Sequence, residues 1–180
     1  MSHIETMSTS SEKPTIFVTR RWPDAAEDAL KQYFKPTFNV DDTPLTAAQI
    51  AAGFASHDAL APTVSDQITA DIIAAGAAGS GRLIANFGVG VNHIDLSAAA
   101  SAGLAVANTP GVLTDATADL TLTLMLMISR RAGEGERELR AGAWAGWRPT
   151  HLMGRSLSSK TLGIIGMGRI GKAVARRAAL

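Results

Sequence analysis

The chain has 180 residues, enough for one ordinary domain and a little more; 46% of them are hydrophobic, 18% are charged, and the net charge is +1. This balance predicts a packed core and gives no support to disorder or to binding of nucleic acid or acidic membranes. The sequence has no cysteine, so disulfides and thiolate metal sites are excluded.

The amino-terminal residues 1–13 are polar and predict a flexible tail without the apolar core of a signal peptide. The most apolar run, 120–128, is far shorter than the roughly 20 residues that a spanning helix needs. We therefore expect a soluble cytoplasmic protein, with neither nucleic acid nor membrane as a partner.

The segment 14–107 alternates between predicted strands and predicted helices. Short β-branched, aromatic or alanine-rich runs predict strands at 15–19, 38–40, 58–61, 82–87 and 104–107. Helices are expected at 23–34, at 46–52 with Thr46 as its cap, from Ser65 as a cap to the glycines at 79 and 81, and at 96–101. This order predicts a parallel sheet with helices on both faces.

The next segment, 114–131, fits two patterns. Alternating apolar residues over 120–128 are also typical of a strand. The good helix formers Ala, Leu and Met, together with a cap expected from Thr114 and Asp115, favour a helix. Because its apolar residues face all sides, we expect this helix to be buried on several sides, at a subunit interface or in an ordinary core.

A glycine motif follows a polar helix at 134–141 and a tryptophan-rich loop at 144–149. The motif Gly166-Met167-Gly168-Arg169-Ile170-Gly171 stands between a predicted strand at 161–165 and a predicted helix at 169–180, which is the context of dinucleotide binding. The alternative is a glycine-rich turn without a ligand.

Each glycine of the motif has an expected role. Gly166 would allow the tight turn, Gly168 would let the backbone approach a pyrophosphate, and Gly171 would let helix and strand pack closely. The amides of Arg169 and Ile170 would face the phosphates at the positive end of the helix.

The residue that reads the adenosine ribose is expected about 20 residues after the glycine loop. The sequence ends at Leu180, so the choice between NAD and NADP stays open. Only the first strand and helix of a mononucleotide-binding half are expected in this sequence, which also predicts a truncated chain. The chain would then be either an incomplete sequence or a natural truncation.

Three stretches resemble the D-isomer-specific 2-hydroxyacid dehydrogenases, in the order in which that family has them. The run 86–95 (NFGVGVNHID) resembles the family's substrate loop, and 106–119 resembles the interdomain crossing with the first coenzyme-domain helix. The runs 146–149 and 161–177 resemble the glyoxylate/hydroxypyruvate reductase branch.

The resemblance covers nearly everything after the tail, and it implies an α/β fold in two parts. A flavodoxin-like substrate domain is expected at 14–107, and the beginning of a Rossmann NAD(P)-binding domain at 108–180. The intact protein is expected to be a homodimer.

The resemblance also implies roles for single residues. The amides of Val89 and Gly90 would hold the substrate carboxylate, and Leu60 would line the cleft. Thr117 would lie next to the coenzyme, and Trp147 would reach the substrate pocket of the neighbouring subunit. For Val89 and Gly90 the alternative is a plain glycine turn, and for Leu60 it is a buried strand leucine. For Thr117 it is a polar residue in the first turn of a helix, and for Trp147 it is interface packing.

The family's catalytic arginine, histidine and carboxylate are expected downstream of the matching region. None of the four histidines, His3, His57, His93 and His151, has a carboxylate at a telling position, so no catalytic residue is assigned. No metal-ligand spacing is found either.

The implied reaction is reversible hydride transfer between NAD or NADP and a small 2-keto or 2-hydroxy acid, with glyoxylate or hydroxypyruvate as the first substrates to test. The chain alone is expected to be inactive. The alternative is a non-catalytic fragment that acts only as a dimerisation or dinucleotide-binding module.

Overall fold

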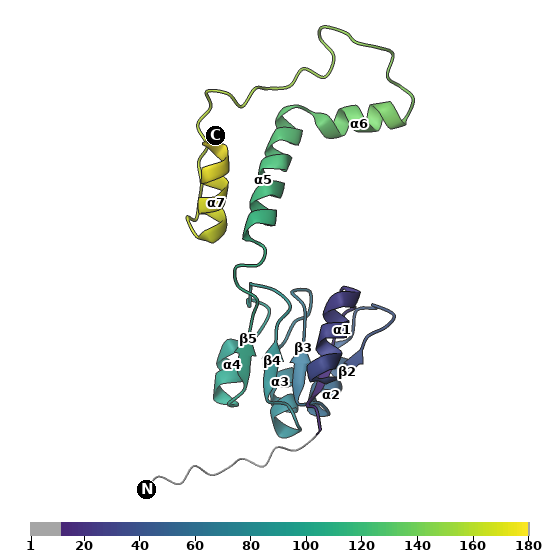
Figure 1. The fold of residues 1–180 in the computed structure, drawn as a ribbon, viewed down its shortest axis with the longest axis vertical. Helices are drawn as coiled ribbons and strands as arrows, with labels where there is room; N and C mark the ends of the chain where they lie inside the picture. The colour runs from purple at the N-terminus through teal and green to yellow at the C-terminus, as the bar shows by residue number, and fades with distance from the viewer. Residues whose placement is uncertain (1–11, 180) are drawn as a thin grey trace. The chain divides into compact units, whose positions relative to one another are not determined.

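The computed structural model describes residues 12–179, and the chain forms two compact units, Met1–Pro110 and Gly111–Leu180 (Figure 1). The expected tail lies almost wholly outside the described residues. Within residues 12–179, no helix has the length and apolar character needed to cross a bilayer.

The first unit is built on a five-stranded sheet in which every strand pair is parallel. Its strands are β1 (Thr15–Val18), β2 (Lys35–Phe38), β3 (Ala59–Ala61), β4 (Leu83–Ala85) and β5 (Ala105–Ala107). The strand order β2-β1-β3-β4-β5 is the flavodoxin-like order. The predicted parallel α/β fold of this part is therefore confirmed.

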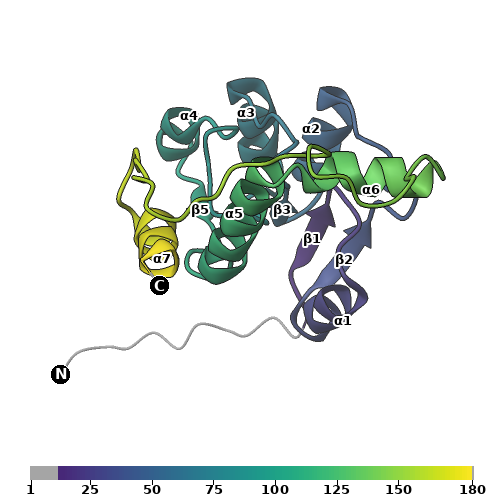
Figure 2. The same cartoon turned by 90° about the horizontal axis from the view of Figure 1, so that it is seen from above.

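Helices cover the sheet on both faces, as Figure 2 shows with α1 on one side and α2, α3 and α4 on the other. They are α1 (Asp24–Tyr33), α2 (Ala47–Ala55), α3 (Ala70–Ala78) and α4 (Leu96–Ser101). Side chains alternate along β3, so Leu60 joins the core with α2 and α3, whereas Ala59 and Ala61 face the other way, into the core that Leu30 of α1 completes.

The cap predicted for α2 is confirmed. Thr46 accepts a hydrogen bond from the Gln49 amide, and the Gln49 side chain accepts one from the Thr46 amide. The cap predicted at Ser65 is wrong, because α3 begins at Ala70 after Thr69.

The reason for the later start of α3 is a buried carboxylate. Asp66 is 6% exposed and accepts hydrogen bonds from the Thr63 amide at 2.8 Å and from the Thr19 hydroxyl at 2.6 Å. These bonds hold 63–66 as a turn, and Ile68 then pairs with Ile94 in an extended bridge.

The strand expected at 38–40 is displaced to β2. Its register with β1 runs from Thr15 opposite Lys35 to Val18 opposite Phe38, so pairing ends at Phe38. Asn39 then turns the chain by donating to the carbonyls of Thr19 and Thr43.

The second unit contains three helices within its described residues, α5 (Thr114–Ser129), α6 (Ala132–Arg140) and α7 (Arg169–Ala178). The choice of helix over strand for 120–128 is confirmed. The cap expected from Thr114 and Asp115 is wrong, because Leu113 occupies the cap position without a side-chain bond.

Within this chain, α5 is not buried on several sides, so the ordinary-core alternative is wrong, whereas burial at a subunit interface stays a prediction. Ala118 is its one buried residue, and it packs on Ala173 and Val174 of α7. Leu124 and Ile128 are 55% and 83% exposed. In the described part of this unit, close packing reaches one side of α5 and leaves the opposite side open.

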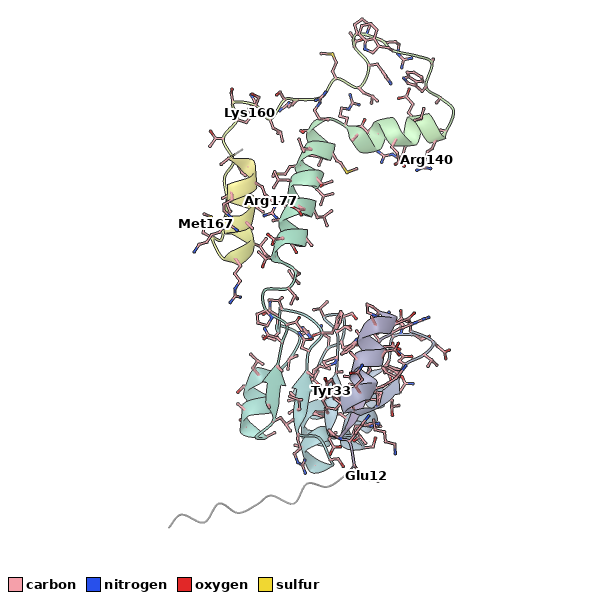
Figure 3. The ribbon with its side chains drawn as sticks, viewed as in Figure 1. Glu12, Tyr33, Arg140, Lys160, Met167 and Arg177 are labelled. Carbon is pink, nitrogen blue, oxygen red and sulfur yellow. The ribbon has the colours of Figure 1, made fainter. Side chains whose placement is uncertain are left out.

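Arg177 fastens α7 to the first turns of α5. Its guanidinium bonds to Asp119 at 2.5 Å and to Asp115 at 3.0 Å (Figure 3). Asp115, which the sequence suggested as part of a cap, is therefore used to join the two helices.

The strand predicted at 161–165 is wrong. This segment is irregular in the structure, and Ile165 is fully exposed. A strand needs a hydrogen-bonded neighbour, and no extended segment pairs with 161–165 among the described residues of this unit.

Candidate functional site

The loop that follows β4 is organised by Asn86. This side chain is 2% exposed, and its amide nitrogen donates to the carbonyls of Gly88 at 3.1 Å and Gly90 at 2.9 Å. Both carbonyls are thereby held on the inside of the turn, at the carboxyl edge of the sheet where ligands of doubly wound folds bind.

His93 supports Asn86 from the far side of the loop. Its Nε2 lies 2.9 Å from the Asn86 carbonyl oxygen, which can only accept, so the hydrogen is assigned to Nε2. Partial burial lowers the pKa of His93 from 6.5, against a smaller opposing effect of Asp66. The neutral ring therefore fits this place.

The turn is also tied to the chain that follows β5. The Asn108 side chain donates to the Val89 carbonyl at 2.8 Å, and the Thr109 amide donates to the Gly88 carbonyl at 3.0 Å. Every carbonyl from Gly88 to Gly90 thus has a donor within the first unit.

The amides of Val89 and Gly90 have no acceptor among residues 12–179. Gly90 is exposed, and a Cβ added to it would meet no atom within 4 Å. An open pocket adjoins it, lined by Val64, Gln67, Gly90, Asn92 and His93. Two free donors on a braced turn are suited to a small anion such as a carboxylate.

Leu60 does not reach this pocket. Its side chain is completely buried in the core between the sheet and helices α2 and α3. The packing alternative therefore holds for Leu60, and we do not carry it into the proposed site.

The glycine motif forms the turn that begins α7. Gly166 has a φ of +91°, a conformation that favours glycine, and a Cβ on Gly171 would stand 2.1 Å from the Gly166 carbonyl oxygen. A Cβ on Gly168 would meet nothing within 4 Å, so the space in front of Gly168 is open.

The start of α7 offers free donors beside that space. The amides of Arg169 and Ile170 have no acceptor among the described residues, and the cap Gly168 has no side chain to supply one. The residues present therefore fit a dinucleotide pyrophosphate, which needs room at the backbone and amide donors.

The last two site candidates lie in the second unit. Thr117 is half-buried at the end of the first turn of α5, beside the buried Ala118. Trp147 is 82% exposed, and nearby Trp144 is 53% exposed. The structure thus leaves the Trp147 indole open to a partner.

Sequence reasoning missed the supporting residues of both units. Asn86 and His93 were quoted only as part of a motif, although an asparagine directly after a buried strand is a recognisable signal. Glu138 was also missed as the carboxylate beside His151, because the end of a helix and a loop separate the two residues in sequence.

The family model for the D-isomer specific 2-hydroxyacid dehydrogenase, catalytic domain, matches residues 16–178. The chain belongs to this family. The resemblance of the sequence to these dehydrogenases is thereby confirmed, and the family consists of NAD(P)-dependent 2-hydroxyacid dehydrogenases.

Curated relatives of the chain include a glyoxylate reductase and a glycerate dehydrogenase. The chain is 39% identical to a glyoxylate reductase of Korarchaeum cryptofilum over 92% of this chain and 50% of that protein. It is 36% identical to a glycerate dehydrogenase of Hyphomicrobium methylovorum over 92% of this chain and 51% of that protein. The chain therefore spans about half the length of the curated relatives it matches.

Solved structures give the same result. A putative D-isomer specific 2-hydroxyacid dehydrogenase from Polaromonas sp. JS6 66 matches with a TM-score of 0.85 and 42% identity, covering 93% of this chain and 52% of that one. An NADPH-dependent glyoxylate/hydroxypyruvate reductase from Sinorhizobium meliloti, solved with NADP and malonate, matches with a TM-score of 0.77 and 32% identity, covering 93% and 50%.

Proposed function

We propose that this chain supplies the substrate-binding part, and the beginning of the NAD(P)-binding part, of a dehydrogenase that reduces a small 2-keto acid. Residues 14–107 would form the substrate domain and 108–180 the start of the coenzyme domain. The observation that carries the proposal is the turn at Val89 and Gly90, whose two free amides are held in place by Asn86.

In this proposal the substrate carboxylate accepts hydrogen bonds from the amides of Val89 and Gly90. Backbone amides donate without a change of protonation, so this binding is expected to persist across neutral pH. Anchoring the carboxylate fixes the orientation of the adjoining carbonyl carbon. Glyoxylate and hydroxypyruvate are the first substrates to test, given the named relatives.

The coenzyme would be held by the glycine turn and the start of α7. Gly166, Gly168 and Gly171 shape the turn, and the amides of Arg169 and Ile170 face the pyrophosphate. Thr117 would lie beside the coenzyme. When bound, NAD or NADP supplies or accepts the hydride. The intact enzyme would be a homodimer in which Trp147 reaches the neighbouring subunit's substrate pocket.

A second candidate function is a non-catalytic module that dimerises or binds a dinucleotide. The exposed apolar side chains of α5, with Leu124 and Ile128 among them, favour this alternative.

Binding of reduced NAD or NADP, followed by nicotinamide fluorescence, tests the coenzyme part of the proposal. A Gly168→Ala chain is the informative variant, because its new methyl group meets no protein atom within 4 Å. The turn without a ligand is therefore left unstrained, while the methyl group occupies the space proposed for the pyrophosphate. We expect saturable binding by the natural chain and at least a tenfold loss in Gly168→Ala. Equal binding by both chains would contradict the proposed place of the pyrophosphate.

A further inference from the structure

A cluster of three charged or titratable side chains joins α6 to the loop that follows it. Glu138 on α6 lies 2.8 Å from Nε2 of His151 through one carboxylate oxygen and 3.6 Å from the Arg148 guanidinium through the other. Arg148 in turn lies 2.8 Å from Nδ1 of His151. Glu138 and His151 are each 21% exposed, so the cluster is largely covered.

The donors in this cluster fix the state of the imidazole. A guanidinium can only donate, so Nδ1 of His151 is the acceptor and the ring hydrogen belongs on Nε2, toward Glu138. The Nε2 contact is close but bent away from good hydrogen-bond geometry, so its attraction to the carboxylate is mainly electrostatic. The three groups form a closed ring of contacts.

The loop between α6 and His151 turns at two glycines and makes further contacts near its end. Gly142 and Gly146 have positive φ values of +66° and +99°, and the His151 amide donates to the Arg148 carbonyl across a turn that contains Pro149. Leu152 follows and lies against α6, where a Cβ on Gly135 would be only 3.2 Å from its methyl group.

We propose that Glu138 is a positioning residue, which through Arg148 and His151 holds the tryptophan loop (144–149) against α6 and so presents Trp147. Arg148 directly follows Trp147, so fixing the guanidinium fixes the backbone that carries the indole. The inference rests on the proposed role of Trp147 at a neighbouring subunit, and it adds the residues that make that role possible.

A catalytic role for this cluster does not fit its geometry. Nδ1 of His151 is taken by Arg148, and Nε2 is buried against Glu138. An ordinary surface ion pair does not fit either. Glu136 on the same helix makes such a pair with Arg140, but its side chain is 57% exposed and its partner 78% exposed.

The test measures backbone order by ¹⁵N relaxation at Ala145, Gly146 and Trp147 in the whole chain. We expect order parameters near ~0.85 in the natural chain and below ~0.6 in Glu138→Gln and Arg148→Gln. Glu136→Gln is the matched control and should leave the loop ordered. The His151 ring should show the Nε2–H tautomer by its ¹⁵N shifts in the natural chain and lose that preference in Arg148→Gln, which removes the guanidinium that donates to Nδ1.

Equal loop order in the natural chain and both variants would overturn the proposal, as would a loop that is already disordered in the natural chain. The amide signals of Ala118 and Val174, from the packed core of the second unit, report whether each variant remains folded there. If Glu138→Gln fails to fold, Arg148→Gln decides the question alone. Dinucleotide binding is measured on the same samples, so failure of the proposed function is seen separately from failure of the loop restraint.

Discussion

At the scale of single residues, the candidate substrate turn depends most on Asn86. A buried amide that donates to two carbonyls does what no apolar residue of similar size can do. Without it, the Gly90 carbonyl would lose its donor within the chain, and the Gly88 carbonyl would keep only the Thr109 amide. The turn's shape, and therefore the direction of its free amides, follows from these bonds.

Replacing Asn86 with alanine should lower the free energy of unfolding by roughly 1–3 kcal/mol, since the part-buried hydrogen bonds to Gly88, Gly90 and His93 are lost. It should also abolish carboxylate binding, because the turn is no longer braced. Urea unfolding followed by circular dichroism measures the first effect. Asn92→Ala is the control for the unfolding measurement, as Asn92 is exposed; a similar loss of stability in both variants would refute the special role of Asn86.

His93 should make stability depend on pH. Burial holds the pKa of folded His93 below the value of 6.5 that it has when exposed, so the unfolded chain takes up the proton first as the pH falls. The stabilising contribution is complete above that value and is lost as the pH falls toward the folded pKa. Urea midpoints measured above and below this pH range should show the loss of stability, and the loss should be smaller in His93→Gln. An equal loss in His93→Gln would contradict the role given to His93.

Single residues also show where sequence reasoning succeeds. The cap at Thr46 was predictable because both partners of its capping box lie within four residues. The cap predicted at Ser65 failed because the Thr19 hydroxyl donates a hydrogen bond to Asp66, and Thr19 is remote in sequence. The role suggested for Leu60 failed for a different reason. The resemblance indicates where Leu60 lies in the fold, but its side chain is buried and contacts the core.

At the scale of elements, α7 and its glycine turn show how two similar glycines differ. Gly171 is packed against the Gly166 carbonyl, and Gly168 faces open space. The turn therefore requires Gly171 for its own structure, while Gly168 is free to serve a ligand.

Gly171→Ala should destabilise the chain by roughly 1–3 kcal/mol, because its methyl group overlaps a backbone oxygen that has to move. Gly168→Ala should leave the free energy of unfolding nearly unchanged. Chemical denaturation of the two variants side by side makes the comparison. If Gly168→Ala were the more destabilising of the two, the assignment of roles within the motif would be wrong.

Elements whose partners are near in sequence were predicted best. Helix α4 and the alternation of strands and helices along the chain followed from local patterns, whereas the ends of β2 are set by its register with β1. The segment 161–165 has the composition of a strand, yet pairing decides whether it becomes one, and no neighbour pairs with it in the described residues. The open side of α5 could not be read from composition, because apolar residues on all sides predict burial.

At the scale of the whole molecule, the two units carry complementary features. The first holds the turn that Asn86 braces, and the second holds the open glycine turn. The family of the chain was predictable because its motifs are short and continuous in sequence. The supporting network around Asn86 was not, because it depends on which side chains the fold brings together.

The chain should not catalyse keto acid reduction by itself. The resemblance assigns none of the described residues to the family's arginine or its histidine–carboxylate pair. His57 is bound to Thr37 and the Gly53 carbonyl, and His93 to Asn86, so neither is a free proton donor. Absorbance of reduced nicotinamide, followed with glyoxylate present, should stay constant; steady oxidation would contradict this expectation.

The most direct test of the account is a titration of the ¹⁵N-labelled chain with glyoxylate, followed by amide chemical shifts. We predict saturable shifts centred on Val89 and Gly90, which a Gly90→Ala variant loses although its fold is unchanged, since the added methyl group meets no protein atom within 4 Å. Shifts spread evenly over basic surface residues, or none at Val89 and Gly90 at saturating glyoxylate, would contradict the assignment of this turn as the substrate carboxylate site.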